Sequence, residues 1–579
     1  MKLKTLSIKN FRNFEDISIT LSNKNVVFGM NDVGKTNFLY ALRFLFERKI
    51  RNKGFLESDF FQKDTTRVIE ICLEIDISDH ETDFDSQNII SKIGKERDSG
   101  NLNSVFIKVI ANFDENEFFG IPKLVWGNQE EELQKIPGEG TFCDLERLFH
   151  VVYVDPLIDL DKIFSLNKRK IFSKQKTQSD GELLEDINVL AEQINSKIST
   201  MESVTKFQEI LTNEYHNLKN EDISVVLRSE MVINGVFNDL QPYITKNTDV
   251  TKKLYPTSGD GRKKILAYSL LNHITEEFNT NKTIPIFLIE EPENSLHRSM
   301  QIALSKQLFN QEIYRYFVMS THSSEMLYEM DKATLIRLCN EDRTIAKSFL
   351  YKVGEEFSKI KRELNESLTT ALFADRVLLI EGPSEKVLFE KILQEIQPNY
   401  ELEGGYILQV DGIKFKPYYK TLINLGINCI VKTDNDLKET TKNSSKQFEY
   451  IGYNRCVGLL DGNEWKKWEG YIEIDYSSSD REDKIKAWKK SNFNQIQKIQ
   501  QLRNKNIYLS KVDLENDLNE AIPETLELWR NTNHDAVPYL QKQKLMRMIK
   551  LCDFLKEEDC QQIYNHSLFE CLKKLTGDF

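Results

Sequence analysis

The segment Gly29-Met-Asn-Asp-Val-Gly-Lys-Thr36 decides the fold of the N-terminal part of the chain. It follows a short apolar run, 25–29, that predicts a strand, and it precedes an amphipathic run, 37–46, that predicts a helix. Two glycines at this spacing let backbone N–H groups wrap a phosphate, while the following lysine reaches the outer phosphates and the threonine hydroxyl binds Mg²⁺. We therefore expect a bound nucleotide to contact Gly29, Asn31, Gly34, Lys35, Thr36 and Asn37.

Two acidic residues end a second apolar segment, Ile286-Phe-Leu-Ile-Glu-Glu-Pro292. At the end of a buried strand, one carboxylate can hold Mg²⁺ and the next can orient an attacking water. We assign the first role to Glu290 and the second, catalytic role to Glu291. Taken alone, such a pair is more often a solvated strand end.

Two further segments add to this pattern. Ser258-Gly-Asp-Gly261 precedes a predicted helix over 262–276, so Ser258 and Gly259 offer a hydroxyl and amides to a phosphate. Phe317-Val-Met-Ser-Thr-His322 is a predicted strand ending in a histidine that can touch the outermost phosphate during catalysis. Taken singly, the first segment would be a plain loop and His322 a structural histidine.

In this order the four segments resemble the ABC-type ATPase head shared by RecF, Rad50 and SMC proteins. The resemblance implies that the nucleotide is ATP and that the serine of one subunit completes the site of another, which requires a head-to-head dimer. The glutamine loop of that family is not found near residues 153–156. The sequence therefore leaves open how a bound nucleotide is linked to a conformational change.

A regular apolar stripe lies between the head segments. Apolar residues recur every three or four positions from Leu183 to Val204, and continue through Phe207, Ile210 and Leu211. This spacing predicts one apolar face along a helix. An ordinary core helix and a dimer-forming helical arm explain the stripe equally well.

Acidic pairs follow three predicted strands of the second half. They are Glu381 and Glu385 after 376–380, Asp434 and Asp436 after 428–432, and Asp513 and Glu515 after 507–510. Strands alternating with helices predict a parallel sheet, whose carboxyl ends carry ligand sites, and Ser384 is the expected N-cap of the helix after the first strand. Six carboxylates there would repel one another without cations, so we expect two Mg²⁺ or Mn²⁺ ions that act on a phosphodiester. Any single pair would more often be a solvated turn.

The form of these pairs (E-G-x-S-E, D-x-D, D-L-E) resembles the Toprim domain of the OLD (overcoming lysogenization defect) nuclease family. The resemblance makes all six carboxylates metal ligands, with Glu381, Asp434 and Asp513 catalytic, and makes Lys544 the residue that contacts the scissile phosphate. Leu437 and Lys438 depart from the topoisomerase form, which favours a nuclease. The wording of the head and of TDNDLK is similar to the anti-phage Gabija nucleases. That similarity implies nucleotide control, assembly beyond a dimer and a UvrD-like helicase partner.

The composition limits the surroundings and partners of the chain. With 40% hydrophobic and 29% charged residues, no membrane-spanning apolar run and no signal-peptide core, it is typical of a cytoplasmic protein. Its eight cysteines are scattered without zinc spacing, which predicts reduced thiols. A net charge of −12 excludes DNA binding through bulk charge, so local basic patches are needed. The candidate patches are 168–170, 262–264, 359–362 and 484–490.

The whole sequence of 579 residues predicts an α/β multidomain protein. The expected parts are an ATPase head at 1–165 and 251–350, a helical dimerisation insert at 166–250, and a Toprim nuclease domain with helical insertions at 351–579. Strand-like stretches at 68–76, 105–112 and 150–154 predict that the first sheet continues after the first helix.

The favoured function is a nucleotide-regulated, divalent-metal-dependent DNA endonuclease of an anti-phage system. It is expected to be a homo-oligomer, a dimer of heads that forms a tetramer. One alternative is an ATP-driven RecF- or SMC-like DNA-binding scaffold without nuclease activity, which metal-dependent cleavage would exclude. A Toprim primase or topoisomerase is the other, and primer synthesis or relaxation without lasting nicks would reveal it.

Overall fold

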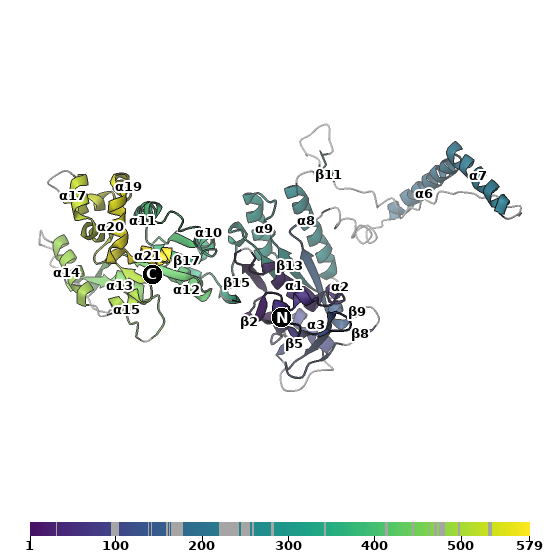
Figure 1. Ribbon diagram of the computed structural model, residues 1–579, viewed down its shortest axis with the longest axis horizontal. Coiled ribbons are helices and arrows are strands. Elements are labelled where there is room, and N and C mark those ends of the chain that lie inside the picture. The colour runs from purple at the N-terminus through teal and green to yellow at the C-terminus, as the bar shows by residue number, and fades with distance from the viewer. Residues whose placement is uncertain are drawn as a thin grey trace. The chain divides into compact units, whose positions relative to one another are not determined.

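The computed structural model of the chain has a mixed α/β architecture built on three main sheets (Figure 1). It describes residues 1–30, 32–93, 103–136, 138–139, 142–157, 160, 163, 178–218, 243–244, 255–256, 260–279, 283–340, 343–411, 415–442, 445–462, 464–467, 472–473, 481–495, 498–530 and 535–578.

An antiparallel sheet forms the first part of the head. Its strands, in the order β2-β1-β4-β5-β6-β7, are β1 (Lys2–Phe11), β2 (Phe14–Thr20), β4 (Ile69–Asp76), β5 (Ser104–Asp114), β6 (Phe119–Gly127) and β7 (Gln134–Lys135). Leu6 and Ile8 alternate with polar residues on β1 and are buried opposite Leu73 and Ile71 of β4, which fixes the register. Helix α1 (Lys35–Phe46) contacts β4 and β5, so the helix after the glycine loop shares this core.

A second, mixed sheet carries the glycine loop. Its strands, in the order β10-β13-β14-β3-β15-β16, are β3 (Lys24–Phe28), β10 (Phe149–Val154), β13 (Ile284–Glu290), β14 (Phe317–Ser320), β15 (Ala333–Asn340) and β16 (Thr344–Tyr351). Strand β3 is parallel to β14 and β15, and β13 is parallel to β14, so the carboxyl ends of β3, β13 and β14 meet at one edge. The prediction that the first sheet continues after the first helix is confirmed for 68–76 and 105–112, because β4 and β5 join β1 and β2 in the antiparallel sheet. The stretch 150–154 forms β10 and belongs to the second sheet instead.

Short elements connect these strands. They are α2 (Arg48–Arg51), α3 (Phe84–Ile93), α4 (Asp144–Leu148), α9 (Arg298–Asn310), the turns η1 (Glu57–Asp59), η2 (Phe61–Lys63), η4 (Glu312–Tyr314), η5 (Glu325–Leu327) and η6 (Glu355–Ile360), and the hairpin β8 (Gly138–Glu139) with β9 (Phe142–Cys143). Helix α10 (Lys361–Ala371) then leaves the head. Its buried Asn365 donates to the carbonyl oxygens of Tyr328 and Met330, both at 2.9 Å, and anchors the start of the next domain.

The middle of the chain contains α6 (Gln178–Ser199), α7 (Glu202–Leu218), α8 (Asp260–Asn279) and the short pair β11 (Tyr243–Ile244) and β12 (Tyr255–Pro256). The predicted stripe is divided between α6 and α7, and Leu190, Ile194 and Ile210 are 57%, 47% and 57% exposed. A core helix would bury these residues, so the stripe in this chain is an apolar face exposed to solvent. The predicted basic patch 262–264 was wrong at Lys264, which is buried and donates to carbonyl oxygens of the chain.

The last domain is built on four parallel strands in the order β18-β17-β19-β23. These are β17 (Arg376–Ile380), β18 (Gly405–Gln409), β19 (Asn428–Thr433) and β23 (Ile507–Leu509). Its other elements are α11 (Pro383–Ile396), α12 (Phe415–Asn424), β20 (Leu437–Lys442), β21 (Ser445–Tyr450), α13 (Ile451–Val457), β22 (Ile472–Glu473), α14 (Arg481–Gln495), α15 (Ile499–Arg503), α16 (Leu514–Ala521), α17 (Pro523–Arg530), α18 (Ala536–Lys542), α19 (Lys544–Phe554), α20 (Glu557–Asn565), η7 (Ser567–Phe569) and α21 (Glu570–Thr576). One buried cluster joins Leu378 and Ile430 of the sheet to Phe389, Leu551 and Leu572 of the helices.

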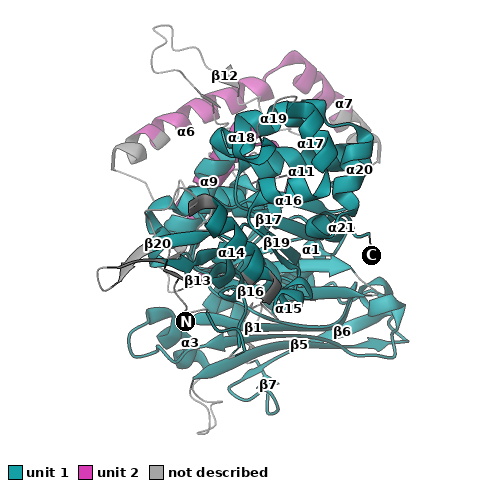
Figure 2. Ribbon diagram, turned by 90° about the vertical axis from the view of Figure 1, so that its left-hand side faces the viewer, with its two compact units in different colours: residues 1–153, 286–293, 298–579 teal, residues 154–285, 294–297 magenta. Residues whose placement is uncertain are grey.

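Packing divides the chain into two compact units (Figure 2). One contains residues 1–153, 286–293 and 298–579, and the other contains 154–285 and 294–297. The predicted insert at 166–250 lies inside the second unit. In the part of the chain that the structure describes, no helix is long and apolar enough to cross a membrane. All eight cysteines are free thiols, as their spacing predicted.

Candidate functional site

The loop between β3 and α1 borders a hollow of about 450 Å³, lined by Asp32, Gly34, Lys35, Thr36, Asn37, Glu291 and His322. Gly29 has a φ of +152°, and a Cβ there would lie 2.3 Å from the carbonyl oxygen of Leu338, so the tight loop requires glycine. The Lys35 ammonium donates to the carbonyl oxygens of Gly29 at 3.2 Å and Met30 at 2.8 Å. Burial lowers the pKa of Lys35, and Glu291 opposes that shift. A cation held over a glycine loop suits a phosphate.

Glu290, at the end of β13, is enclosed by two hydroxyl groups. Thr36 on α1 and Tyr153 on β10 both donate to its carboxylate, which is almost completely buried. The Arg43 guanidinium lies 3.7 Å from the centroid of the Tyr153 ring and pairs with Glu47 at 2.6 Å. The structure thus brings together Thr36 and Glu290, the two predicted Mg²⁺ ligands.

Glu291 and His322 lie side by side at the same edge. The distance from His322 Nε2 to Glu291 Oε1 is 3.2 Å, and the His322 backbone N–H donates to Glu293 at 2.6 Å. Burial, and then Lys35, lowers the pKa of His322, so the ring is neutral at neutral pH. Glu291 has a φ of +41°, a left-handed conformation that costs roughly 1–3 kcal/mol and persists only where surrounding contacts enforce it.

The remaining predicted nucleotide contacts are only partly described. Asn37 donates to Asn13 and accepts from Arg12, both at 2.8 Å, so its side chain braces the loop. Asn31, Ser258 and Gly259 lie outside the described residues, and their roles stay predictions.

Glu381, directly after β17, is at the centre of a group of donors at the second predicted site. Its carboxylate accepts from the Thr433 hydroxyl, from the Asp434 backbone N–H at 3.1 Å, and from the Arg455 guanidinium. Arg455 also lies 3.6 Å from Asp436 Oδ2. A protein cation therefore lies among the predicted metal ligands.

Glu385 and Asp434 are crowded by neighbouring carboxylates. Glu385 accepts from the Gly382 backbone N–H at 2.8 Å, so Gly382 begins the helix and the predicted Ser384 N-cap was wrong. Burial, and then Glu381, raises the pKa of Glu385 to about 7. Burial, and then Glu385 and Glu381, raises the pKa of Asp434 well above its usual range.

Asp513 and Glu515 lie at the start of α16, beside the end of β23. Asp513 caps that helix and its Oδ2 accepts from Gln541 at 2.7 Å. Glu515 is 1% exposed, neither of its carboxylate oxygens accepts a hydrogen bond, and Lys544 Nζ lies 3.4 Å away. Burial lowers the pKa of Lys544, but the charges of Glu515, Asp434 and Asp513 outweigh burial, and the pKa is raised. The predicted lysine therefore lies among the predicted carboxylates.

The chemistry of this donor set fits divalent cations. Carboxylate oxygens are the ligands that Mg²⁺ and Mn²⁺ prefer, and three buried oxygens, one of Glu385 and two of Glu515, lack hydrogen-bond partners. Within the described ranges no three such side chains converge on one point. Glu381 accepts instead from Arg455, and Asp513 accepts from Gln541. A bound cation would replace these contacts.

A buried ion pair lies behind the carboxylates. Lys432 on β19 and Asp517 on α16 are 1% and 0% exposed, and Nζ is 2.7 Å from Oδ2. Lys432 also donates to the Leu568 carbonyl oxygen at 3.2 Å, and Asp517 accepts from the Lys511 backbone N–H at 3.1 Å. The pair connects the strand and the helix that carry two of the three acidic pairs.

Sequence reasoning missed three residues that contact the predicted ones, namely Tyr153, Arg455 and Gln541. Arg455 and Gln541 stand alone in unremarkable helical segments, so no motif marked them. Tyr153 had an indirect signal, because it lies where the glutamine loop was sought and not found.

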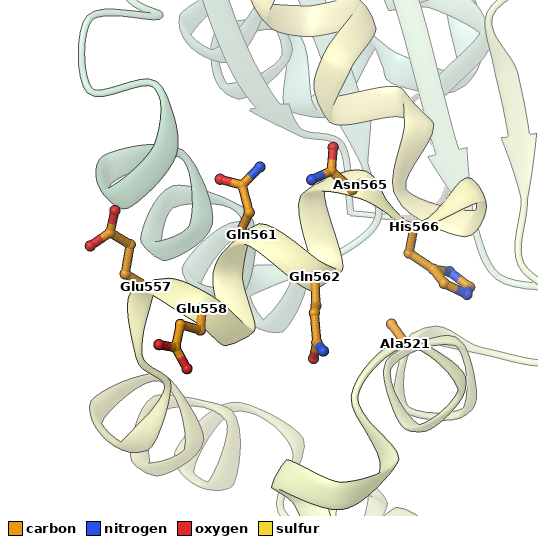
Figure 3. Close-up of a pocket in the computed structure, with 7 residues that line it drawn as sticks. All are labelled: Ala521, Glu557, Glu558, Gln561, Gln562, Asn565 and His566. Carbon is orange, nitrogen blue, oxygen red and sulfur yellow. The ribbon is translucent and has the colours of Figure 1, made fainter.

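Another hollow, of about 770 Å³, lies along α20 (Figure 3). Figure 3 shows carboxylate and amide side chains around it, and none of the predicted site residues. Its residues are Ala521, Glu557, Glu558, Gln561, Gln562, Asn565 and His566. We assign it no part in either site.

Comparison with known proteins places the chain in a family. The model of the TOPRIM domain of overcoming lysogenization defect-like proteins matches residues 372–436, and an AAA ATPase domain model matches 1–141. Endonuclease GajA of Bacillus cereus (strain VD045) is 46% identical over 579 residues, covering 100% of this chain and 99% of GajA. The chain belongs to the GajA endonuclease family.

More distant relatives agree with that assignment. The Old nuclease of Escherichia phage P2 is 21% identical over 469 residues, covering 75% of this chain and 77% of the phage protein. An SMC head bound to the C-winged helix domain of ScpA covers 62% of this chain and 100% of its own at 13% identity. The TM-score of that comparison is 0.33.

Membership in the GajA family confirms the predicted order of an ATPase head followed by an OLD-type Toprim domain, and it confirms an endonuclease. In general, ATPase domains use a nucleotide and TOPRIM domains use a divalent metal. The scaffold, primase and topoisomerase alternatives are accordingly disfavoured.

Proposed function

We propose that this chain is a divalent-metal-dependent DNA endonuclease whose cleavage is regulated by ATP bound to the head. The observation that carries the proposal is the meeting of three acidic pairs at one edge of a parallel sheet, beside Lys544. Sheets of this type bind ligands at that edge. Burial and then the neighbouring carboxylates raise the pKa of Asp434, and bound cations would offset that repulsion, which supports a metal site.

The six carboxylates would hold two ions, Mg²⁺ or Mn²⁺. All six would be metal ligands, and Glu381, Asp434 and Asp513 would be the catalytic ones among them. The other three ligands would be Glu385, Asp436 and Glu515. When bound, such ions activate a water and stabilise the leaving oxygen of a phosphodiester. The Lys544 side chain, 49% exposed, would bind a non-bridging oxygen of the scissile phosphate. The Lys432–Asp517 ion pair would hold β19 and α16 together, and so fix the positions of the acidic pairs that they carry.

In the head, we propose that ATP binds the glycine loop with its Mg²⁺ held by Thr36 and Glu290. Lys35 would bind the outer phosphates and Glu291 would orient a water. The neutral His322 ring would contact the γ-phosphate. Ser258 and Gly259 of another copy would complete the site, so ATP binding would join two heads.

Replacing Tyr153 by phenylalanine should increase the affinity for Mg²⁺-ATP about three- to tenfold. The Tyr153 hydroxyl occupies a Glu290 oxygen that the ion needs, and a hydrogen bond to a charged group contributes about 1.5–3 kcal/mol. The measurement is titration of a fluorescent ATP analogue with excess Mg²⁺. Tyr40→Phe is the matched control, since that ring also lies against Arg43, at 4.9 Å. Equal affinities for the wild type and Tyr153→Phe would contradict the role of the hydroxyl.

We propose a homo-oligomer, a dimer of heads that forms a tetramer, working with a UvrD-like helicase in anti-phage defence. The exposed apolar face of α6 and α7 supports self-association, because apolar side chains at this density normally find a partner. The likeness to GajA supports the defence role. Mass measurement of the purified protein checks the assembly, and a particle of 67.8 kDa, one chain, would contradict it.

The test of the proposed function is a plasmid assay. Supercoiled plasmid is incubated with the wild type in Mg²⁺, Mn²⁺ or EDTA, each with and without ATP, alongside Lys35→Ala. Nicked product should form only with a divalent ion, and Lys35→Ala should lose the response to ATP. Cleavage that persists in EDTA would contradict the metal. A wild type that cuts no DNA under any condition, even with the helicase added, would favour the scaffold.

A further inference from the structure

A basic hollow on the head belongs to neither proposed site. It has a volume of about 750 Å³ and lies between α2 and the edge of the antiparallel sheet formed by β6 and β7. Four of the residues that line it are cationic, and one is anionic. They are Arg48, Arg51, Lys123 and Lys135, and Glu146. The segment 48–53, which includes α2, carries four cations and no acid.

The pleat of the sheet places the lysines on one face. Ile121, Lys123 and Val125 alternate along β6, so their side chains point to the same side. Lys135 on β7 is the cross-strand partner of Val125 and therefore shares that side. All four residues line the hollow together with Arg48. The arrangement is a cationic surface built from three separate segments.

Only one of the four cations is neutralised. Arg51 is buried, contacts Glu146 and donates to the Leu45 carbonyl oxygen at 2.6 Å. Among the residues that the structure describes, Arg48, Lys123 and Lys135 form no ion pair with a carboxylate. The acidic turn 130–132 lies between β6 and β7 but does not line the hollow.

We propose that this hollow binds the sugar–phosphate backbone of DNA, apart from the cleavage edge of the Toprim domain. The proposal rests on the proposed function, because it assumes a DNA substrate. The backbone fits better than a free nucleotide, since the lining contains no aromatic ring to stack on a base and the cations are spread over three segments. Ile121, 42% exposed, offers apolar contact to a sugar. A chain of net charge −12 needs such a local surface to hold a polyanion.

The experiment measures binding without cleavage. Fluorescence anisotropy of a labelled 30-base-pair duplex of arbitrary sequence is recorded in EDTA at several salt concentrations. The variant Arg48→Ala/Lys123→Ala/Lys135→Ala should bind at least about tenfold more weakly at roughly 100 mM salt, and its slope of log affinity against log salt should fall by about three. The matched control, Lys2→Ala/Lys9→Ala/Lys63→Ala, removes three exposed lysines outside the hollow. It should bind like the wild type.

Two other outcomes would overturn the proposal that the hollow binds DNA. Equal binding by the wild type and the hollow variant would overturn the proposal while leaving the nuclease intact, as would equal weakening in both triple variants. A single charge reversal, Lys123→Glu, should weaken binding in a chain whose melting temperature is unchanged, which excludes misfolding as the cause. If the wild type neither binds nor nicks DNA, the proposed function itself fails, and the plasmid assay separates that failure from loss of the hollow alone.

Discussion

Replacing Asp434 by asparagine should abolish metal-dependent plasmid cleavage, lowering its rate by at least about a thousandfold. Asparagine keeps the shape of the side chain but removes the charge at the centre of the acidic cluster. Burial and then Glu385, Glu381 and Asp513 raise the pKa of Asp434, so this carboxylate is buried among negative charges that a cation would offset. The rate is measured from nicked product against time in saturating Mn²⁺.

The control for this prediction is Asp553→Asn, the same chemical change at an exposed position on α19. It should cut like the wild type. A second readout separates loss of metal from loss of fold: Mn²⁺ should raise the melting temperature of the wild type and of Asp553→Asn, but raise that of Asp434→Asn much less. An Asp434→Asn protein that retains a tenth of the wild-type rate would contradict the assignment.

Replacing Asp517 by asparagine should lower the free energy of unfolding of the Toprim domain by about 3–5 kcal/mol. The change leaves the Lys432 ammonium buried without its ion-pair partner, because Asp517 is the carboxylate that pairs with it among the residues that the structure describes. Water cannot reach this buried ammonium group. The cost of removing its charge from water is no longer offset by a partner, and the folded state is destabilised by that amount. Urea denaturation followed by tryptophan fluorescence gives the change in the free energy of unfolding.

Two further variants set limits on the size of that effect. Removing both charges in Lys432→Met/Asp517→Leu should recover most of the stability, because a well-packed apolar pair of similar volume replaces a buried ion pair at little cost. Lys511→Ala breaks the partly exposed pair of Lys511 with Glu520 and should cost no more than about 1 kcal/mol. If Asp517→Asn is no worse than Lys511→Ala, the pair does not hold the domain together.

Local patterns predicted the strands that carry chemistry, but not the sheets to which every strand belongs. The apolar runs at 376–380 and 428–432 coincide with β17 and β19 because each is short, continuous and followed by a turn. Sheet membership is non-local. Strands β4 and β5 look no different from β3 in composition, yet they pair with β1, and only the tertiary structure decides that.

The residues of the candidate site were likewise predictable only in part. Spacing after predicted strands was sufficient to place Glu381 and Asp434 at one edge, because neighbouring parallel strands end together. It could not show which donors hold these carboxylates. Arg455 reaches Glu381 only because the hairpin of β20 and β21 returns the chain to the edge before α13 begins. The basic hollow was missed for a similar reason, since no single segment of it contains enough cations to stand out from a solvated surface.

The position of β3 in its sheet has a consequence for synthesis of the protein. Both neighbours of this strand, β14 and β15, come from roughly 300 residues further along the chain. At about 5–20 residues per second, the glycine loop leaves the ribosome roughly 15–60 s before the strands that flank it exist. The antiparallel sheet can fold on the nascent chain during that interval, whereas the nucleotide pocket cannot. The ATP binding proposed for this loop would therefore begin only in a chain whose head has been translated to its end.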